Sequence, residues 1–376
     1  MKKRICALVC AILLCCGPAA AGAEPVQSTL ESGENIFVFS LIGDCCIGDN
    51  AWSPGTQSGY LNKIKKAGFD YPFSLVADMF AEDDLTVANC ECTFTDRLKH
   101  RNGIYFPMLA PTSYAEVLRL GNVDVCNLAN NHCLRDVGKK GGEETAAALT
   151  TQGIGYFYDD NTWSTEVKGV KVGFVGFTYP MNNGKLKRYV KAMEKLRAEG
   201  CTFVVASAHW GTEPTQSKST GKEYLLDGNQ KYGVKLIDAG FDMVYGHGSH
   251  TCQMIRWYKG KVIFYSLGNF TYGANANQKD SDTVVAQIRY DIHEDGTMTA
   301  RDLTCLPFKQ HENKDYRPCP IPEEDTEGRM RVWAKLYYNN EKKNYEKHKA
   351  SPAPSLPESF LTTGYADFRD LPVTEE

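Results

Sequence analysis

Side chains that can bind metal ions recur in this sequence directly after short apolar runs. The clearest case is the segment 127–138, Asn-Leu-Ala-Asn-Asn-His-Cys-Leu-Arg-Asp-Val-Gly, which follows the apolar run 123–126. Burying the adjacent amides of Asn130 and Asn131 with an imidazole and a carboxylate is costly unless these groups have partners, and a metal ion with its substrate would supply them. The same pattern places Asp44, Glu91, His209, His247 and His250 after other apolar runs.

These residue types indicate a hydrolytic metal site. Zinc, manganese and iron accept imidazole as well as carboxylate ligands, and a two-metal site needs a bridging ligand with open positions for water and substrate. His247 and His250 can reach one ion only if the chain turns between them, because side chains three apart on a strand point to opposite faces. Gly246 and Gly248 permit such a turn. The candidate ligands are Asp44, Glu91, Asn130 or Asn131, His209, His247 and His250, with His132 available for proton transfer.

Each residue also has a purely structural explanation. Asp44 could cap a helix, Asn130 and Asn131 could form a turn, and His209 could pack beside Trp210. Because all of these residues are expected at the ends of strands, a shared metal site is favoured over separate structural roles.

The spacing of apolar runs and helix-like segments predicts an α/β fold. Because ligands in such folds bind where the carboxyl ends of the strands converge, one pocket should gather the polar residues. The expected strands are 36–42, 85–88, 123–126, 170–177, 201–208 and 241–245, followed by antiparallel strands 253–258, 261–267, 284–291 and 298–306. The expected helices are 72–80, 111–120, 142–151, 185–199, 232–239 and 323–349, and the proline-rich segment 351–376 should be extended.

The N-terminus has the pattern of a signal peptide. Lys2-Lys3-Arg4 precedes the apolar run 5–16, and Ala21-Gly22-Ala23 fits a cleavage site. We therefore expect a signal peptide over 1–23, a polar leader over 24–35, and export to the cell surface or the medium. An uncleaved membrane anchor and a lipoprotein signal, suggested by Cys15 and Cys16, are the alternatives.

Composition excludes some classes of protein. The 376 residues are 23% charged and 42% hydrophobic, as in soluble globular proteins, and cleavage after Ala23 would take the formal charge from −4 to −7. No nucleic-acid partner is expected, since no basic patch with interleaved aromatic residues occurs. The basic strip Lys185, Lys187, Arg188 and Lys191 is a solvated helix face or steers an anionic substrate.

Ten of the fourteen cysteines lie outside the signal segment. No pair has zinc-ribbon spacing. Packing as small hydrophobic side chains is favoured over disulfides for the group Cys45, Cys46, Cys90, Cys92, Cys126 and Cys133.

Six ordered motifs resemble those of the bacterial capsule-synthesis proteins of the CapA type, which are linked to poly-γ-glutamate. The resemblance covers residues 36–272. The motifs are Gly43-Asp44, Asn89-x-Glu91, Asn127-x-Ala129-Asn130-Asn131-His132-x-x-Asp136-x-Gly138, His209-Trp210-Gly211-x-Glu213, Gly246-His247-x-x-His250 and Tyr265-Ser266-Leu267-Gly268-Asn269-Phe270.

The family is similar to the calcineurin-like metallophosphoesterases, and this likeness implies a fold. We expect a four-layer α/β/β/α sandwich over residues 36–310, a helical C-terminal extension over 311–349 and a proline-rich tail over 350–376.

The resemblance also implies roles for individual residues. One or two divalent ions are expected, with manganese, zinc, iron and magnesium not distinguished. The implied metal ligands are Asp44, Glu91 as a bridge, Asn131, His209, His247 and His250. His132 would be the proton donor and Asp136 would orient it. The implied outer contacts to ligands or substrate are Asn89, Asn130 and Glu213. Asn269 either completes the wall of the pocket or belongs to a structural Gly-Asn turn with aromatic packing over 265–270.

The chain departs from the family pattern at two places. Asp44-Cys45-Cys46 stands where phosphoesterases have Asp-x-His, and Gly248 and Ser249 replace His-Pro in the fifth motif.

The expected function is that of an exported, metal-dependent protein in the synthesis, release or attachment of a surface polymer such as poly-γ-glutamate, by metal-activated hydrolysis. Its partners would be an anionic polymer or phosphoester, with membrane-bound capsule-synthesis machinery as a further candidate partner. A non-catalytic polymer-binding factor and a general secreted metallophosphoesterase are the alternatives.

Overall fold

The computed structural model describes residues 25–26, 33–50, 59–97, 106–211, 230–273, 280–310, 315–338 and 353–373. The expected signal peptide, most of the leader, Glu213 and residues 339–349 lie outside this part of the chain.

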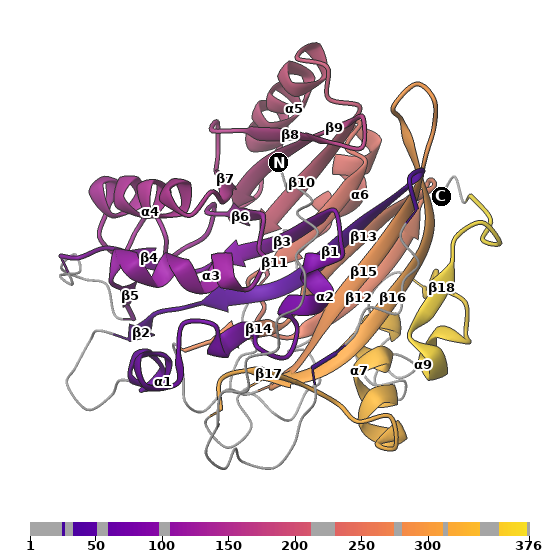
Figure 1. Ribbon diagram of the computed structural model, residues 1–376. Coiled ribbons are helices and arrows are strands. Elements are labelled where there is room, and N and C mark those ends of the chain that lie inside the picture. The colour runs from indigo at the N-terminus through magenta and orange to yellow at the C-terminus, as the bar shows by residue number, and fades with distance from the viewer. Residues whose placement is uncertain are drawn as a thin grey trace.

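Two large β-sheets face each other and carry helices on their outer sides (Figure 1). The first sheet has the order β17-β16-β15-β1-β3-β6-β7, with β14 added beside β1 and β18 beside β16. Its strands are β1 (Ile36–Cys46), β3 (Leu85–Cys90), β6 (Val125–Asn127), β7 (Gly155–Phe157), β14 (Asn269–Tyr272), β15 (Asp282–Ile292), β16 (Met298–Gln310), β17 (Pro318–Pro320) and β18 (Tyr365–Asp367). Strands β1, β3, β6 and β7 run parallel, while β15 and β16 pair antiparallel.

The second sheet has the order β12-β13-β11-β10-β9-β8. Its strands are β8 (Trp163–Val167), β9 (Val170–Thr178), β10 (Phe203–His209), β11 (Met243–His247), β12 (Cys252–Tyr258) and β13 (Lys261–Leu267). Strands β9, β10, β11 and β13 are parallel, and β8 and β12 pair antiparallel at the edges. A small third sheet joins β2 (Asp49–Asn50), β5 (Met108–Ala110) and β4 (Thr93–Phe94).

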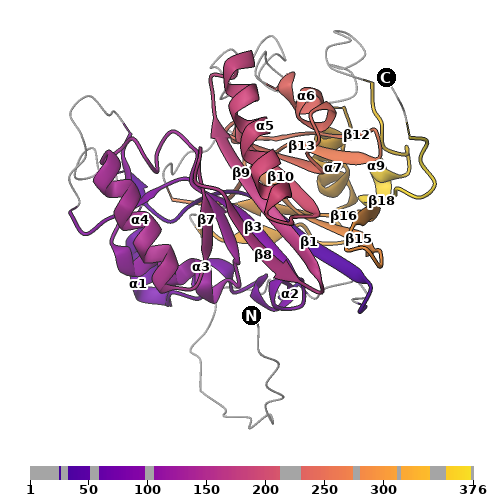
Figure 2. The same cartoon turned by 90° about the horizontal axis from the view of Figure 1, so that it is seen from above.

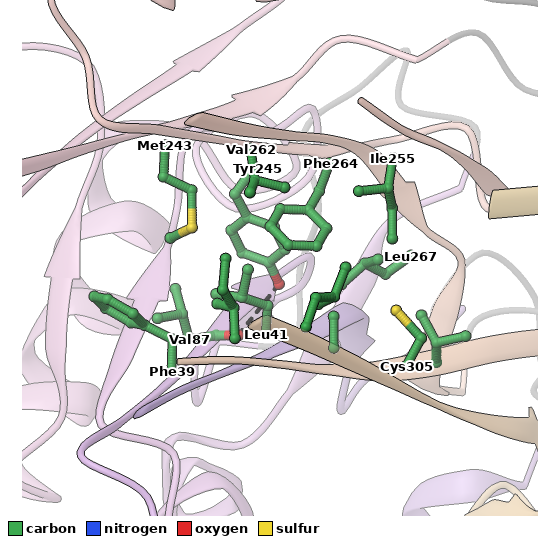
Figure 3. Packing of buried hydrophobic residues seen from close by; sticks show 14 of the residues in the cluster. Phe39, Leu41, Val87, Met243, Tyr245, Ile255, Val262, Phe264, Leu267 and Cys305 are labelled. Carbon is green, nitrogen blue, oxygen red and sulfur yellow. Dashed lines mark hydrogen bonds between the residues drawn. The ribbon is translucent and has the colours of Figure 1, made fainter. Parts of the chain in front are cut away.

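The main core lies between the two large sheets. Phe39, Leu41 and Val87 of the first sheet pack against Met243 and Tyr245 of the second (Figure 3). These strands read as near-continuous apolar runs because both faces are covered, one by the other sheet and one by helices.

Separate apolar clusters lie under the outer helices, so four layers are present (Figure 2). The helices on the first sheet are α1 (Tyr60–Ala67), η1 (Tyr71–Phe73), α2 (Ala77–Ala81), η2 (Thr112–Ala115), α3 (Glu116–Leu120) and α4 (Lys139–Thr151). The second sheet carries α5 (Asn183–Ala198) and α6 (Tyr232–Asp238). The expected α/β/β/α sandwich is confirmed.

Two sequence expectations about local structure were wrong. The helix expected over 72–80 is split into η1 and α2, and the sequence pattern missed α1. The segment 353–373, expected to be extended, contains α9 (Phe360–Thr363) and β18, which pairs with β16. Prolines are frequent in this segment, but the apolar residues between them are buried against the main core, and this packing stabilises the helix and the strand.

The C-terminal elements complete the sandwich. Trp333 and Leu336 of α7 (Thr326–Tyr338), Phe360 and Phe368 belong to the same buried cluster as the two sheets. The Trp257 and Phe368 rings stack at 4.4 Å. These segments therefore form part of the domain's core.

All ten cysteines of the described part are free, and nine are buried. The six for which packing as small hydrophobic side chains was expected all belong to one apolar cluster, which confirms that expectation: Cys45, Cys46, Cys90, Cys92, Cys126 and Cys133. Among the residues described, no helix combines the length and apolar character that crossing a bilayer requires.

Candidate metal centre

The candidate residues come from the carboxyl ends of parallel strands in both sheets. In the first sheet Asp44 lies beside Asn89, and in the second His209 lies beside His247. The strand ends converge as expected for a ligand-binding edge.

Asp44 reaches the space between the sheets because the strand pairing is irregular around it. The register between β1 and β3 shifts between Leu41 and Asp44, and the amide of Asp44 donates to the carbonyl of Gly268, 2.8 Å away. A Cβ at Gly43 would lie 2.1 Å from that same carbonyl oxygen, so no other residue fits there without movement. At Gly268 the chain leaves the second sheet and enters the first as β14.

A buried tyrosine occupies the interface at this irregularity. The hydroxyl of Tyr245 donates to the carbonyl oxygen of Ile42 and to that of Val87, the latter at 3.2 Å. Tyr245 and Val87 are labelled in Figure 3. Its ring contacts His247, two residues further along β11. Tyr245 thereby connects the irregularly paired segment of β1 and β3 to β11, the strand that carries His247.

Two imidazoles converge on Asp44. His250 Nδ1 lies 3.1 Å from Asp44 Oδ2, and His247 Nδ1 lies 3.3 Å from Oδ1 without the alignment of a hydrogen bond. Both reach the carboxylate because the chain turns at Gly248, with φ of 92°, and at His250, with φ of 57°. The turn expected from the glycines is present.

Glu91 joins a third imidazole to this group. Glu91 Oε1 lies 3.1 Å from His209 Nε2 and 3.8 Å from His250 Nε2. One ligand atom from each of Asp44, Glu91 and His250 lies within 4.8 Å of the others. Two carboxylates and three imidazoles, drawn from both sheets, therefore form one cluster.

The donor atoms of this cluster fit divalent cations. Several are buried and lack a hydrogen-bond partner: Glu91 Oε2, His209 Nδ1, His247 Nδ1 and, from the neighbouring loop, Asn131 Oδ1. Unpaired buried polar atoms are costly, and a cation bound among them would remove that cost. Carboxylate and imidazole together suit zinc, manganese or iron.

The local electrostatics favour the ligand forms of these side chains. Burial alone would raise the pKa of Asp44, but His247 and His250 outweigh it and hold that pKa below its usual value. Burial lowers the pKa of His247 despite the nearby carboxylate of Asp44. An ionised Asp44 and a neutral His247 are the states in which both can bind a metal.

A second group holds His132 beside the cluster. His132 Nδ1 lies 2.9 Å from Asp136 Oδ2, which also accepts from the amide of Met108 at 2.7 Å. When Nδ1–H donates to the carboxylate, Nε2 is the ring nitrogen that remains outside this contact. Asp136 thus fixes both the tautomer and the ring orientation.

Amide side chains connect His132 to Asp44. Asn130 Oδ1 accepts from the amides of His132 and Cys133, at 3.1 and 2.8 Å. Asn130 Nδ2 donates to Asn89 Oδ1, and Asn89 Nδ2 donates to Asp44 Oδ1 at 2.9 Å. The buried amides form a chain of hydrogen bonds from the His132 loop to the cluster.

A family model, described as "Bacterial capsule synthesis protein PGA_cap", matches residues 38–274, well over half of the sequence. The chain belongs to this family. It is 28% identical over 261 residues to the capsule biosynthesis protein CapA of Bacillus anthracis; the match covers 62% of this chain and 61% of that relative. It is 25% identical over 301 residues to the PGA biosynthesis protein CapA of Bacillus subtilis (strain 168), covering 74% and 73%.

A solved structure of a hypothetical protein from Thermus thermophilus is similar with a TM-score of 0.43 and 15% identity. That likeness covers 73% of this chain and 99% of that one.

In this PGA_cap chain Cys46 does not replace the missing imidazole. Its thiol donates to the carbonyl of Gly48 and packs in the cluster under the outer helices, away from Asp44. Asn269 Oδ1 lies 2.8 Å from His250 Nδ1, so Asn269 contacts a candidate ligand. Asn131 has its Oδ1 buried beside His132, and Glu213 lies outside the described residues.

Three further residues of the site were not expected from the sequence. Asn127 Nδ2 donates to Asn89 Oδ1 at 3.3 Å, Ser207 Oγ lies 3.3 Å from His247 Nε2, and Tyr245 spans the sheets. Ser207 lies two residues before His209 in an otherwise apolar strand, so a lone polar residue in a buried run was the available signal. By engaging Nε2, Ser207 leaves His247 Nδ1 directed at the cluster.

Proposed function

We propose that this protein is exported and uses one or two divalent cations to cleave a bond of an anionic surface polymer such as poly-γ-glutamate. The single observation that supports this most strongly is the convergence of two carboxylates and three imidazoles from both sheets. Membership of the PGA_cap family, and relatives described as capsule and PGA biosynthesis proteins, support the polymer.

The proposed binding arrangement divides the cluster between the sheets. Asp44, His247 and His250 would hold one cation and His209 and Asn131 a second. Glu91, which lies 3.1 Å from His209 and 3.8 Å from His250, would contact both. Bound cations supply an activated water near neutral pH and offset negative charge at the attacked centre.

The remaining residues act on the substrate and its protons. His132, held through Nδ1–H by the carboxylate of Asp136, would act in its protonated form, transferring the Nε2 proton to the leaving group and becoming a neutral imidazole. Asn89 and Asn130 would hold the His132 loop at a fixed distance from Asp44.

The experiment combines metal analysis of the purified full chain with hydrolysis assays on poly-γ-glutamate and on a generic phosphodiester. Bound transition metal with cleavage of poly-γ-glutamate alone supports the proposal. Broad cleavage of small phosphoesters would instead identify a general secreted metallophosphoesterase.

A non-catalytic polymer-binding factor is a second candidate, favoured by one observation. Cys46 stands in place of an imidazole and points away from the centre, so the ligand set lacks a group that phosphoesterases use. Stoichiometric metal and polymer binding without any cleavage would support this candidate, which would act beside membrane-bound capsule-synthesis machinery.

A further inference from the structure

An exposed aromatic ring lies directly against one of the candidate ligands. Tyr179 follows β9, whose last residue Thr178 is paired with His209 of β10. The amide of Tyr179 donates to the carbonyl of His209 at 2.9 Å, and the two rings stack with centroids 6.2 Å apart and planes inclined by 26°. Tyr179 is 41% exposed, whereas His209 is 2% exposed. The tyrosine therefore borders the centre and is open to solvent.

A lysine is held at the same strand end. Lys185 Nζ donates to the carbonyl of Thr178 at 3.2 Å. Its backbone amide donates to the side chain of Asn182, the residue that caps α5. The first turn of α5 thus places an ammonium group at the end of β9, next to the residue that is paired with His209 of β10.

The positive charge along this helix is only partly neutralised. Arg188 forms an ion pair with Asp160. Within the part of the chain that the structure describes, no carboxylate pairs with Lys185, Lys187 or Lys191, and the last two are exposed. The strip noted in the sequence therefore carries lysines without a paired carboxylate among the described residues, and Lys185 is the one that lies at the end of β9.

We propose that Tyr179 and Lys185 form a substrate subsite that binds the unit of an anionic polymer next to the bond at the metal centre. Lys185 pairs with a carboxylate of that unit, and the exposed part of the Tyr179 ring packs against its chain carbons and planar amide. This inference rests on the proposed function and assigns the polymer-binding contacts to the β9 side of the centre.

The chemistry of the two side chains suits an extended polyanion. A lysine ammonium is a point charge that attracts carboxylates without demanding one geometry, and an aromatic ring provides area for the chain between the charges.

The test measures equilibrium binding of poly-γ-glutamate to the full chain by calorimetry at several salt concentrations, with metal content determined on the same samples. The variants are Tyr179→Ala, Tyr179→Phe and Lys185→Ala. Lys195→Ala is the matched control, because Lys195 lies near the opposite end of α5 and pairs with Glu199.

We expect Tyr179→Ala and Lys185→Ala each to weaken binding by roughly 5- to 10-fold, an ordinary value for one aromatic or ionic contact. Tyr179→Phe should retain affinity, because the ring supplies the contact. Lys185→Ala should also make binding less dependent on salt, which a merely structural role would not do. Lys195→Ala should match the wild type.

The subsite would be overturned if both alanine variants bound the polymer with the affinity and salt dependence of the wild type, at the same metal content as the wild type. It would also be overturned if the wild type did not bind the polymer. Failure of the proposed function appears separately, as a wild type that contains no metal. Even then, comparing the affinity of the wild type and of the variants for poly-γ-glutamate would show whether Tyr179 and Lys185 bind the polymer.

Discussion

Nε2 of His209 lies 3.1 Å from Oε1 of Glu91, and this contact joins the second sheet to the first at the candidate metal centre. The two residues are 118 positions apart in the sequence. Their approach fixes the spacing between the sheets at the edge where the other candidate ligands lie.

Replacing Glu91 by glutamine should remove most of the bound metal. The substitution keeps the size of the side chain but removes the charge that lies between His209 and His250. We expect metal affinity to fall by more than ~10-fold, since even changes to outer contacts of ligands cost that much. Metal analysis after dialysis measures the effect. Glu166→Gln, at an exposed position of β8, is the control, and equal metal content in both variants would exclude Glu91 as a ligand.

His132→Ala should slow polymer cleavage by roughly 10²- to 10⁴-fold, the usual contribution of a positioned acid or base. Metal content should stay at the wild-type level, because His132 is held by Asp136 and not by the carboxylates of the cluster. Asp136→Asn should give a smaller loss, since the ring keeps a hydrogen-bond partner. Unchanged turnover in His132→Ala would remove its assignment as proton donor.

Tyr245→Phe should lower the free energy of unfolding by about 1–3 kcal/mol. The substitution removes the hydroxyl that donates to the buried carbonyls of Ile42 and Val87. The loss of stability is the free energy of keeping these polar groups away from water without that hydrogen bond. Chemical denaturation measures it. Tyr232→Phe, which removes a hydrogen bond to Asn183 at the surface, should cost much less; equal losses would mean that the buried hydroxyl has no special role.

The metal-free protein should lose stability as the pH falls from 7 to 5. Burial keeps the pKa of His247 below its ordinary 6.5, so below that pH the unfolded chain takes up a proton that the folded chain resists. Asp44 does not contribute in this window, because its lowered pKa matters only below about 4. Denaturation curves in chelator should show a shallower dependence for His247→Gln, and parallel curves would contradict this account.

Lys335→Ala should cost about 3–5 kcal/mol of stability, because it removes the cation paired with the buried carboxylate of Asp280. The neighbouring Asp282 keeps its ion pair with Arg331. Lys335 Nζ lies 2.8 Å from Asp280 and 2.6 Å from Asp282, which attaches α7 to β15. Burial alone would lower the pKa of Lys335, but the two carboxylates raise it. Lys259→Ala breaks an exposed pair with Asp238 and should cost under ~1 kcal/mol. Thermal or chemical unfolding measures both variants. If Lys335→Ala and Lys259→Ala lost similar stability, the buried contacts of Lys335 would have no special importance.

Much of the fold could be predicted from the sequence because its signals are local. A strand covered on both faces must be apolar throughout, so 36–42, 85–88 and 201–208 were identifiable without the structure. The polar residues that end these runs could be placed at one edge, since parallel strands in one sheet end together. The turn between His247 and His250 followed from strand geometry and two glycines.

The pairing of elements distant in sequence depended on the tertiary structure. The crossing at Gly268, the irregular register at Asp44 and the position of Tyr245 arise where two sheets approach each other, and no local pattern encodes that approach. The packing of Cys46 under the outer helices and the burial of Phe360 and Phe368 in the core also depend on contacts between segments that are distant in the sequence. The sequence thus determined which groups stand at strand ends, whereas the three-dimensional packing of the two sheets determined that Glu91 meets His209.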